Sequence, residues 1–386
     1  MASFRCRILF GVLFTLIAGM VGASAADKVL RLPGAQVEPL GYTTLDGWAA
    51  DDHAAAFGSF LKSCKPIRAG TPAMRAARPM FGGLYEACGH AVEMAAKPVT
   101  AREARAFFEK NFTPVRVTPA GEPGGFFTGY YETVIDGSRK KTAEYHVPLY
   151  RTPAVASAYD RTQIEEGALA GKGLEIVWLK NPVDAFFAQI QGSARIKLAG
   201  GDTMRVGYAA RNGLPYTPVG KFLIERGVVS KEDMTMDKIR DFMEANPDEG
   251  RELRRKNRSY VFFREVPLGA EQHSTGGQGV ELTPDRSLAV DRSLHVYGTP
   301  IWVEADLPIA SEKPVTPFRK LTIAQDTGTA IIGPARADIF FGAGEELGKI
   351  AGRIKQFGKF VMLVPKGVTV SGVPAGVPTP PARPRS

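Results

Sequence analysis

The feature of the sequence that most constrains the fold is a set of short apolar segments in its C-terminal third. β-Branched and aromatic residues dominate these segments, and Gly, Pro or charged residues separate them. They are "RSLAVD", "TPIWVEA", "KLTIAQD", "DIFFG" and "KFVMLVP", between residues 286 and 365, with one helical segment, "GEELGKIAGRI", among them. Short strands of this kind favour a closed barrel. We therefore expect residues 282–365 to complete a β-barrel.

Residues 113–281 combine strand and helix patterns, which predicts barrel strands together with a second β domain. The segments "GGFFTGYYETVIDG", "AEYHVPLYRTP" and "SYVFFREV" have strand composition, and "RIKLAGGDTMRVGYA" predicts a hairpin about its Gly-Gly pair. Helices are predicted at "NPVDAFFAQIQG" and "TPVGKFLIERG", because each has Pro near its first turn and Gly at its end. A polar helical stretch follows over residues 235–257.

The sequence on either side of this β-rich region has a different character. Apolar spacings of three and four in "LDGWAADDHAAAFGSFLKSC" and "TAREARAFFEKNF" predict a short helical lead-in over residues 26–112. Residues 366–386 are rich in Pro and Gly without an apolar period, so we expect a disordered tail. The predicted fold class is mainly β.

Residues 1–25 have the order of a secretion signal. Arg5 and Arg7 precede the apolar run "ILFGVLFTLIAGMVG", and the small residues "ASA" follow it. An uncleaved anchor is the alternative, but the run is short for a membrane span. Cys6 precedes the run, so no lipid anchor is expected. We expect a periplasmic protein, and association with the outer membrane or the cell wall stays open.

Export changes how the cysteines and the net charge are interpreted. Removal of the signal leaves Cys64 and Cys88 in a compartment that permits disulfides, so we expect them to pair; two unrelated buried thiols are the alternative. Loss of Arg5 and Arg7 leaves 47 basic and 40 acidic side chains, a formal net charge of +7. This balance favours an anionic polymer as partner, and outside the cytoplasm nucleic acid is not expected.

The usual hydrolase motifs do not occur in the sequence. The five histidines are widely separated without metal-ligand spacing, and there is no G-x-S-x-G motif, so we expect no metal and no cofactor. Two carboxylates remain in "QDTGTAIIGPARADIFFG", where Asp326 and Asp338 lie twelve positions apart. The apolar residues after Asp338 predict a raised pKa for its carboxyl group, as a general acid requires.

Seven ordered motifs between about residues 120 and 365 resemble the membrane-bound lytic murein transglycosylase A family. They are "GYYE", "FFAQIQGSARIKL", "VGYAARNGLPYTPVG", "SYVFFRE", "LTPDRSLAVD", "GTPIWVE" and "AQDTGTAIIG…ADIFFGAG". The resemblance implies a double-psi β-barrel with a second β domain inserted in it. It also implies that a peptidoglycan glycan strand binds in the groove between them. The implied activity is cleavage of the MurNAc–GlcNAc β-1,4 bond without water, giving 1,6-anhydroMurNAc ends. Other cell-wall enzymes are further candidate partners.

The same resemblance assigns roles to individual residues. The three aspartates of the family's last segment fall on Asp291, Asp326 and Asp338, and the motif places the acid and base role on Asp338 with Asp326 beside it. The residues implied to contact sugar are Tyr130, Gln191, Ser193, Tyr208, Asn212 and Asp291. The sequence departs from the family in "VDRSLHVYGTP", in "GTAI" and in the missing lipid-anchor cysteine.

Each of these residues also has a purely structural interpretation. Aspartates before Thr-Gly often stabilise turns, Tyr130 fits a cross-strand contact, and the amides of Gln191 and Asn212 lie beside glycine turns. Two other functions therefore stay open. One is a two-carboxylate peptidoglycan hydrolase, for which Glu132 is the candidate second acid. The other is a non-catalytic wall-binding protein that does not need Asp338.

Overall fold

The computed structural model describes residues 29–70, 79–267, 269 and 272–372. The predicted signal peptide lies outside the described residues. None of the helices in the described part of the chain is long and apolar enough to cross a membrane. The strands are β1 (Val29–Leu32), β2 (Ala35–Pro39), β3 (Phe112–Pro119), β4 (Gly125–Ser138), β5 (Val147–Tyr150), β6 (Glu175–Leu179), β7 (Ser193–Leu198), β8 (Thr203–Arg211), β9 (Val261–Glu265), β10 (Ser287–Val290), β11 (Pro300–Leu307), β12 (Thr316–Asp326), β13 (Arg336–Ala343), β14 (Lys355–Pro365) and β15 (Thr369–Gly372). The α-helices are α1 (His53–Ala69), α2 (Met80–Met94), α3 (Ala101–Asn111), α4 (Arg161–Glu165), α5 (Pro182–Gln191), α6 (Gly220–Glu225), α7 (Met236–Ala245), α8 (Pro247–Lys256) and α9 (Glu345–Arg353).

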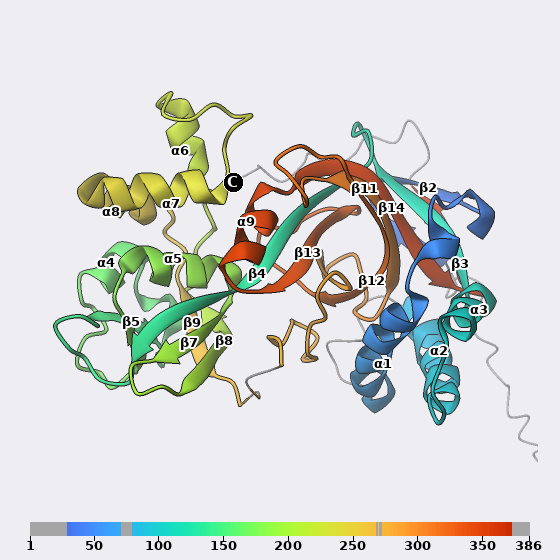
Figure 1. The fold of residues 1–386 in the computed structure, drawn as a ribbon, viewed down its shortest axis with the longest axis horizontal. Coiled ribbons are helices and arrows are strands. Elements are labelled where there is room, and N and C mark those ends of the chain that lie inside the picture. Colours follow the sequence, from blue (N-terminus) through green and yellow to red (C-terminus); the bar gives the residue numbers. More distant parts are fainter. Residues whose placement is uncertain (1–28, 71–78, 268, 270–271, 373–386) are drawn as a thin grey trace, which may run out of the picture.

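The five segments of the C-terminal third form strands of a closed ring, which we call the barrel (Figure 1). Around the ring the order is β14, β11, β12, β10, β13 and β4, and an antiparallel pairing of β4 with β14 closes it. The pairs β10–β12 and β13–β4 are parallel, and the other pairs of the ring are antiparallel. Buried side chains such as Phe127, Ile339 and Phe360 fill its interior.

Strand β4 runs from the barrel into the second domain (Figure 1). Its first half pairs with β13 as far as Glu132, and from Thr133 onward it pairs with β7. Strands β5 to β9 complete the second sheet, in which β7 and β8 form the predicted hairpin. Helix α5 is confirmed with the predicted ends, because the Asn181 side chain caps its start and Gly192 adopts a left-handed conformation after it.

Helices contribute more to the molecule than the mainly β prediction allowed, so the fold is mixed α/β around a large sheet. Helices α1, α2 and α3 lie against the barrel, whereas α5 lies against the second sheet and α6 to α8 lie on the far side of α5 (Figure 1). The predicted lead-in also contains two strands: β1 pairs with β15, and β2 extends the barrel sheet through β3.

The prediction of a disordered tail is wrong for its first residues. Thr369 to Gly372 form β15, which lies parallel to β1. The physical reason is that β1 buries Leu30 and Leu32 in the core and offers an edge on which the β-branched residues of "TVSG" can pair. The remaining residues of the predicted tail, 373–386, lie outside the described part.

Helix α1 fixes the strand that carries Asp326. The buried side chain of Gln325 donates from Nε2 to the Ser59 carbonyl and to Ser63 Oγ, both at 2.9 Å. Helix α1 is joined to α2 by a disulfide between Cys64 and Cys88, the two cysteines expected to pair. The helical lead-in therefore supports the barrel wall directly behind one of the two carboxylates.

Candidate active site

Asp326 and Asp338 lie on the two strands that flank the short strand β10. Ala289 of β10 is in register with Asp326 of β12 on one side and with Asp338 of β13 on the other. Neighbouring strands lie about 4.8 Å apart, so both carboxylates stand on the same patch of the sheet. Both side chains are half-buried. The register of three strands thus brings together two groups that the chain separates by twelve positions.

Asp338 is held through one of its two carboxylate oxygens. Thr128 Oγ1 donates to Asp338 Oδ1 at 2.6 Å, and Arg336 Nη2 donates to Thr128 Oγ1 at 2.8 Å. In the described part of the chain, Asp338 Oδ2 has no hydrogen-bond donor. Burial raises the pKa of Asp338, while the Arg336 charge and the Thr128 hydroxyl act in the opposite direction. A raised pKa with one free oxygen is what a proton donor requires.

Asp326 accepts more hydrogen bonds than Asp338, and they involve both of its carboxylate oxygens. Gly277 N and Thr327 N donate to its Oδ1 at 2.7 and 2.8 Å, and the Tyr130 hydroxyl donates to its Oδ2 at 2.9 Å. Burial raises the pKa of Asp326 to about 6, although these three donors favour the ionised form. Burial and the adjacent carboxylate raise the pKa of Tyr130 well above its usual value, so this phenol stays a neutral donor.

Aromatic rings border the two carboxylates. The Tyr130 ring lies 5.2 Å from that of Phe340, and the His273 ring packs edge-on against Phe340 at 5.7 Å. Burial lowers the pKa of His273. The loop that contains His273 also supplies Gly277, and a Lys62–Glu281 ion pair of 2.9 Å ties the loop to α1. This loop therefore positions the backbone donor of Asp326.

Three of the residues implied to contact sugar gather on the second domain beside β4. Gln191 ends α5, and its Oε1 accepts from the Tyr131 backbone N–H at 3.2 Å. Ser193 begins β7 and pairs with Gly207, the neighbour of Tyr208. Tyr208 has 49% of its surface exposed. The two domains approach each other nearby, where Arg211 donates to Thr329 Oγ1 at 3.3 Å. Gln191 and Ser193 are partly exposed as well.

The structure does not place Asn212 on an open surface. Its side chain is 1% exposed, and its Nδ2 donates to the carbonyls of Tyr159 and Arg258 at 3.1 and 3.0 Å. Its Oδ1 accepts from Tyr260 N at 3.0 Å. With both ends of the amide occupied, Asn212 has the contacts of a residue that holds a loop, and these contacts favour a structural role over a sugar contact.

Asp291 is similarly occupied, although it lies next to β10. Its Oδ1 accepts from the backbone and side chain of Ser293 at 2.9 and 2.6 Å, and its Oδ2 accepts from Gly333 N at 2.9 Å. The residue is 8% exposed. These contacts tie the start of the loop after β10 to the loop between β12 and β13. They therefore favour a structural role for Asp291 over a sugar contact.

Glu132 is buried between two arginines. Arg205 Nε lies 2.8 Å from one of its oxygens and Arg195 Nη2 lies 3.3 Å from the other, and its exposed fraction is zero. Burial raises the pKa of Glu132, and the two guanidinium groups oppose that change. A carboxylate paired in this way anchors β4 to the second sheet, and both of its oxygens have an arginine partner.

Sequence reasoning missed three groups of the site: Thr128, Arg336 and the Gly277 backbone. The first two could have been found, because Thr128 and Tyr130 alternate onto one face of a strand, as do Arg336 and Asp338. Gly277 lies in a loop far from both aspartates in the sequence, and no local pattern marks it.

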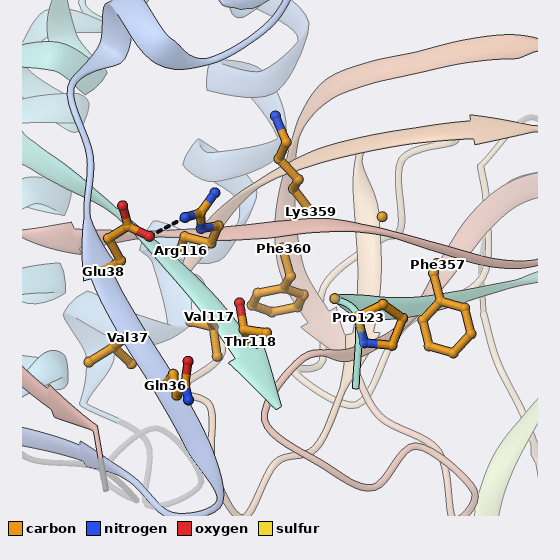
Figure 2. Close-up of a pocket in the computed structure, with 12 residues that line it drawn as sticks. Gln36, Val37, Glu38, Arg116, Val117, Thr118, Pro123, Phe357, Lys359 and Phe360 are labelled. Carbon is orange, nitrogen blue, oxygen red and sulfur yellow. Dashed lines mark hydrogen bonds and ion pairs between the residues drawn. The ribbon is translucent and has the colours of Figure 1, made fainter. Parts of the chain in front are cut away.

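The structure also has a pocket of about 590 Å³ on another part of the barrel (Figure 2). It lies between β2, β3 and the start of β14, and neither Asp326 nor Asp338 lines it. In the described residues, no group of three or more His, Cys, Asp or Glu side chains could hold a metal ion. The carboxylate patch, with two carboxyl groups whose pKa burial raises, is an arrangement that can carry acid–base chemistry.

Comparisons with known proteins show which family shares this combination of barrel and second domain. The model of the MltA specific insert domain matches residues 126–158 and 154–264, and that of the 3D domain matches residues 286–364. The membrane-bound lytic murein transglycosylase A of Vibrio cholerae is 35% identical over 237 residues, which are 60% of this chain and 63% of that protein. The match thus spans slightly less than two thirds of this curated relative.

Solved structures match a larger part of the chain. A membrane-bound lytic murein transglycosylase from Agrobacterium tumefaciens is 32% identical with a TM-score of 0.78, covering 86% of this chain and 98% of its own. The structure of Escherichia coli MltA with bound chitohexaose is 30% identical with a TM-score of 0.64, covering 80% of this chain and 90% of its own. The chain belongs to the membrane-bound lytic murein transglycosylase A family.

Proposed function

We propose that this protein is a peptidoglycan lytic transglycosylase that cleaves the MurNAc–GlcNAc β-1,4 bond without water and leaves 1,6-anhydroMurNAc ends. The observation that carries the proposal is the state of Asp338, a half-buried carboxyl group with a raised pKa and one oxygen free of donors in the described chain. The names of the relatives and the bound chitohexaose in the Escherichia coli structure support the same activity and a glycan substrate.

The proposed reaction uses Asp338 twice. The protonated carboxyl group gives its proton to the leaving O4 as the C1–O4 bond breaks. The resulting carboxylate then accepts the proton of the C6 hydroxyl of the MurNAc residue, while O6 of that residue bonds to its own C1. Because the nucleophile is tethered, its effective concentration can reach about 10⁵–10⁸ M, so ring closure can outrun attack by water. No second carboxylate is needed to activate water.

The other residues of the patch have supporting roles in this proposal. Tyr130 and two backbone donors hold Asp326, which supplies a fixed polar wall for the sugar bearing the cleaved bond. Gln191, Ser193 and Tyr208 contact the glycan from the second domain. Asn212 and Asp291 hold the loops around the groove and do not touch the substrate.

We extend the proposal to the type of barrel, the division into domains, the localisation and the partners. The parallel pairs β10–β12 and β13–β4 within the ring support a double-psi arrangement of the barrel. The passage of β4 between the two sheets supports division into a domain at 113–281 and a barrel-completing segment at 282–365. Export to the periplasm follows from the predicted signal peptide and places the protein beside its glycan substrate. Other wall enzymes remain candidate partners.

The main alternative is a hydrolase that uses Glu132 as its second carboxylate. The paired arginines on Glu132 count against it, because the group that must activate water needs a free oxygen. Digestion of purified peptidoglycan in ¹⁸O-labelled water decides between the two. We expect anhydro ends that are lighter than hydrolytic ends by one water and carry no label. Predominant ¹⁸O incorporation at the new ends would return the protein to the hydrolases, and no release at all would favour a binding protein.

A further inference from the structure

A row of three side chains runs beside the carboxylate patch on the outer face of the barrel. Phe126 of β4 is in register with Arg336 of β13 on one side and with Phe357 of β14 on the other. The Arg336 guanidinium lies 5.3 Å from the centroid of the Phe126 ring, and the Phe126 and Phe357 rings lie 5.2 Å apart. Side chains two residues apart share a face of a strand, so this row and the row of Thr128 and Asp338 face the same side.

Phe357 is the outer end of this row, and half of its surface is exposed. Single exposed apolar residues are common on proteins, but Phe357 is not isolated. It packs against Phe126, and Arg336 lies over Phe126 while donating to Thr128, which in turn holds Asp338. The exposed ring is thus joined by direct contacts to the proposed catalytic group.

Phe357 also lines the pocket of about 590 Å³. Phe357 and Pro123 lie on one side of this pocket in Figure 2, and the Glu38–Arg116 ion pair lies on the other. The volume is in the range of pockets that hold small molecules. Between these sides the pocket offers the amide of Gln36 and the hydroxyl of Thr118. Apolar side chains, Phe357 and Pro123, therefore lie beside polar side chains in one pocket.

The charges of the pocket favour an uncharged ligand. Its two cationic side chains are both paired with carboxylates, Arg116 with Glu38 and Lys359 with Glu304. A phosphate or an acidic peptide would have to compete with these partners. A sugar does not need a free cationic side chain for binding. The apolar face of its pyranose ring can stack on an aromatic ring while its hydroxyl and N-acetyl groups form hydrogen bonds with polar side chains.

We propose that Phe126, Phe357 and the adjoining pocket form an accessory saccharide site for the glycan strand being cleaved. Phe357 lies two strand spacings from Asp338, about 10 Å, and two residues back along the strands, about 7 Å. A sugar on this platform is therefore remote from the reacting bond. It adds affinity for long strands and contributes nothing to the chemical step. This inference rests on the proposed function.

The test compares Phe357→Ala with the unchanged protein on peptide-free glycan strands of four and of ten sugars. We expect KM for the longer strand to rise roughly three- to tenfold, the size of one aromatic contact, with kcat unchanged and the short strand unaffected. Val315→Ala is the matched control, because Val315 is also an exposed apolar residue, at 64%, and does not line the pocket. Melting temperatures of both variants show whether the fold is retained.

Direct binding separates this inference from the activity itself. In an Asp338→Asn background, calorimetry with the ten-sugar strand measures affinity without turnover. If Asp338→Asn binds the strand and the double variant with Phe357→Ala binds it equally well, the accessory site is wrong and the proposed function stands. An equal loss for short and long strands, or a loss confined to strands that carry peptides, also overturns the site. Failure of the unchanged protein to bind any glycan overturns both proposals.

Discussion

At the scale of single residues, Asp338 and Asp326 differ in how many donors hold them. Asp326 accepts three hydrogen bonds that span both oxygens, whereas Asp338 accepts one on Oδ1. Burial raises both pKa values, that of Asp326 to about 6, so burial favours the protonated form of each carboxyl group. Only Asp338 has an oxygen without a donor in the described chain, and this difference supports its role as the acid.

Asp338→Asn is expected to lower the turnover of peptidoglycan by roughly 10²–10⁴-fold while leaving glycan affinity intact, because Asn keeps the shape but transfers no proton. Asp326→Asn should slow the reaction less, since the Asp326 side chain accepts hydrogen bonds and the oxygen of an amide can still accept some of them. Release of soluble anhydro-sugar products and calorimetric binding give the two readouts. An inactive Asp326→Asn beside an active Asp338→Asn would reverse the assignment.

The pH dependence should report on Arg336 and Thr128. Both groups stabilise the ionised form of Asp338 and so lower its pKa relative to the effect of burial alone. In Arg336→Gln or Thr128→Val the pKa of Asp338 should rise. Because the acid must be protonated, activity is lost as pH rises through this pKa, so the alkaline limb of kcat/KM should move to higher pH. Fitted profiles of the two variants and the unchanged protein check the direction, and a shift to lower pH contradicts it.

At the scale of elements, β4 holds the site together because it contacts the barrel, the second sheet and α9. Its Gly129 lies under α9, and an added Cβ would lie 2.8 Å from Ala351 Cα and 2.9 Å from Phe341 Cε2. A glycine is required here because the helix backbone packs directly on the strand. The neighbours Thr128 and Tyr130 on the opposite face bind the two aspartates, so displacement of α9 is transmitted to the site.

Gly129→Ala is therefore expected to destabilise the protein by about 1–3 kcal/mol, as overpacking of a close contact does, and to lower activity. Gly58→Ala is the matched control, because Gly58 lies in α1 with nothing within 4 Å of an added Cβ. There alanine should be neutral or slightly stabilising, by up to about 1 kcal/mol. Chemical denaturation measures both changes. Equal effects of the two substitutions would mean that the packing under α9 is not tight.

At the scale of the whole molecule, the two sequence ends of the described chain meet in the sheet formed by β1 and β15. Leu30 and Leu32 of β1 are buried in the same core as the barrel, and Val370 of β15 packs against that core. The pairing therefore ties the start of the helical lead-in to the end of the barrel, beyond what the disulfide between α1 and α2 provides.

A chain that ends at Gly367 should melt several degrees below the full chain, because it leaves the edge of β1 unpaired and uncovers its leucines. A chain that ends at Gly372 keeps β15 and serves as the control, with an expected melting temperature close to that of the full chain. Thermal unfolding followed by circular dichroism makes the comparison. Equal melting of the two truncated chains would show that β15 contributes no stability.

The sequence alone determined the elements whose signals are local. The Gly-Gly hairpin of β7 and β8 and the Pro-to-Gly limits of α5 follow from turn and capping chemistry, which acts within a few residues. The tertiary structure decided the rest. Ala289 is in register with both Asp326 and Asp338, and Gly277, from a loop distant in the sequence, donates a hydrogen bond to Asp326. Strand β15 pairs with β1, which lies at the other end of the described chain. Strand register and long-range pairing depend on which surfaces are buried together, and no local pattern contains that information.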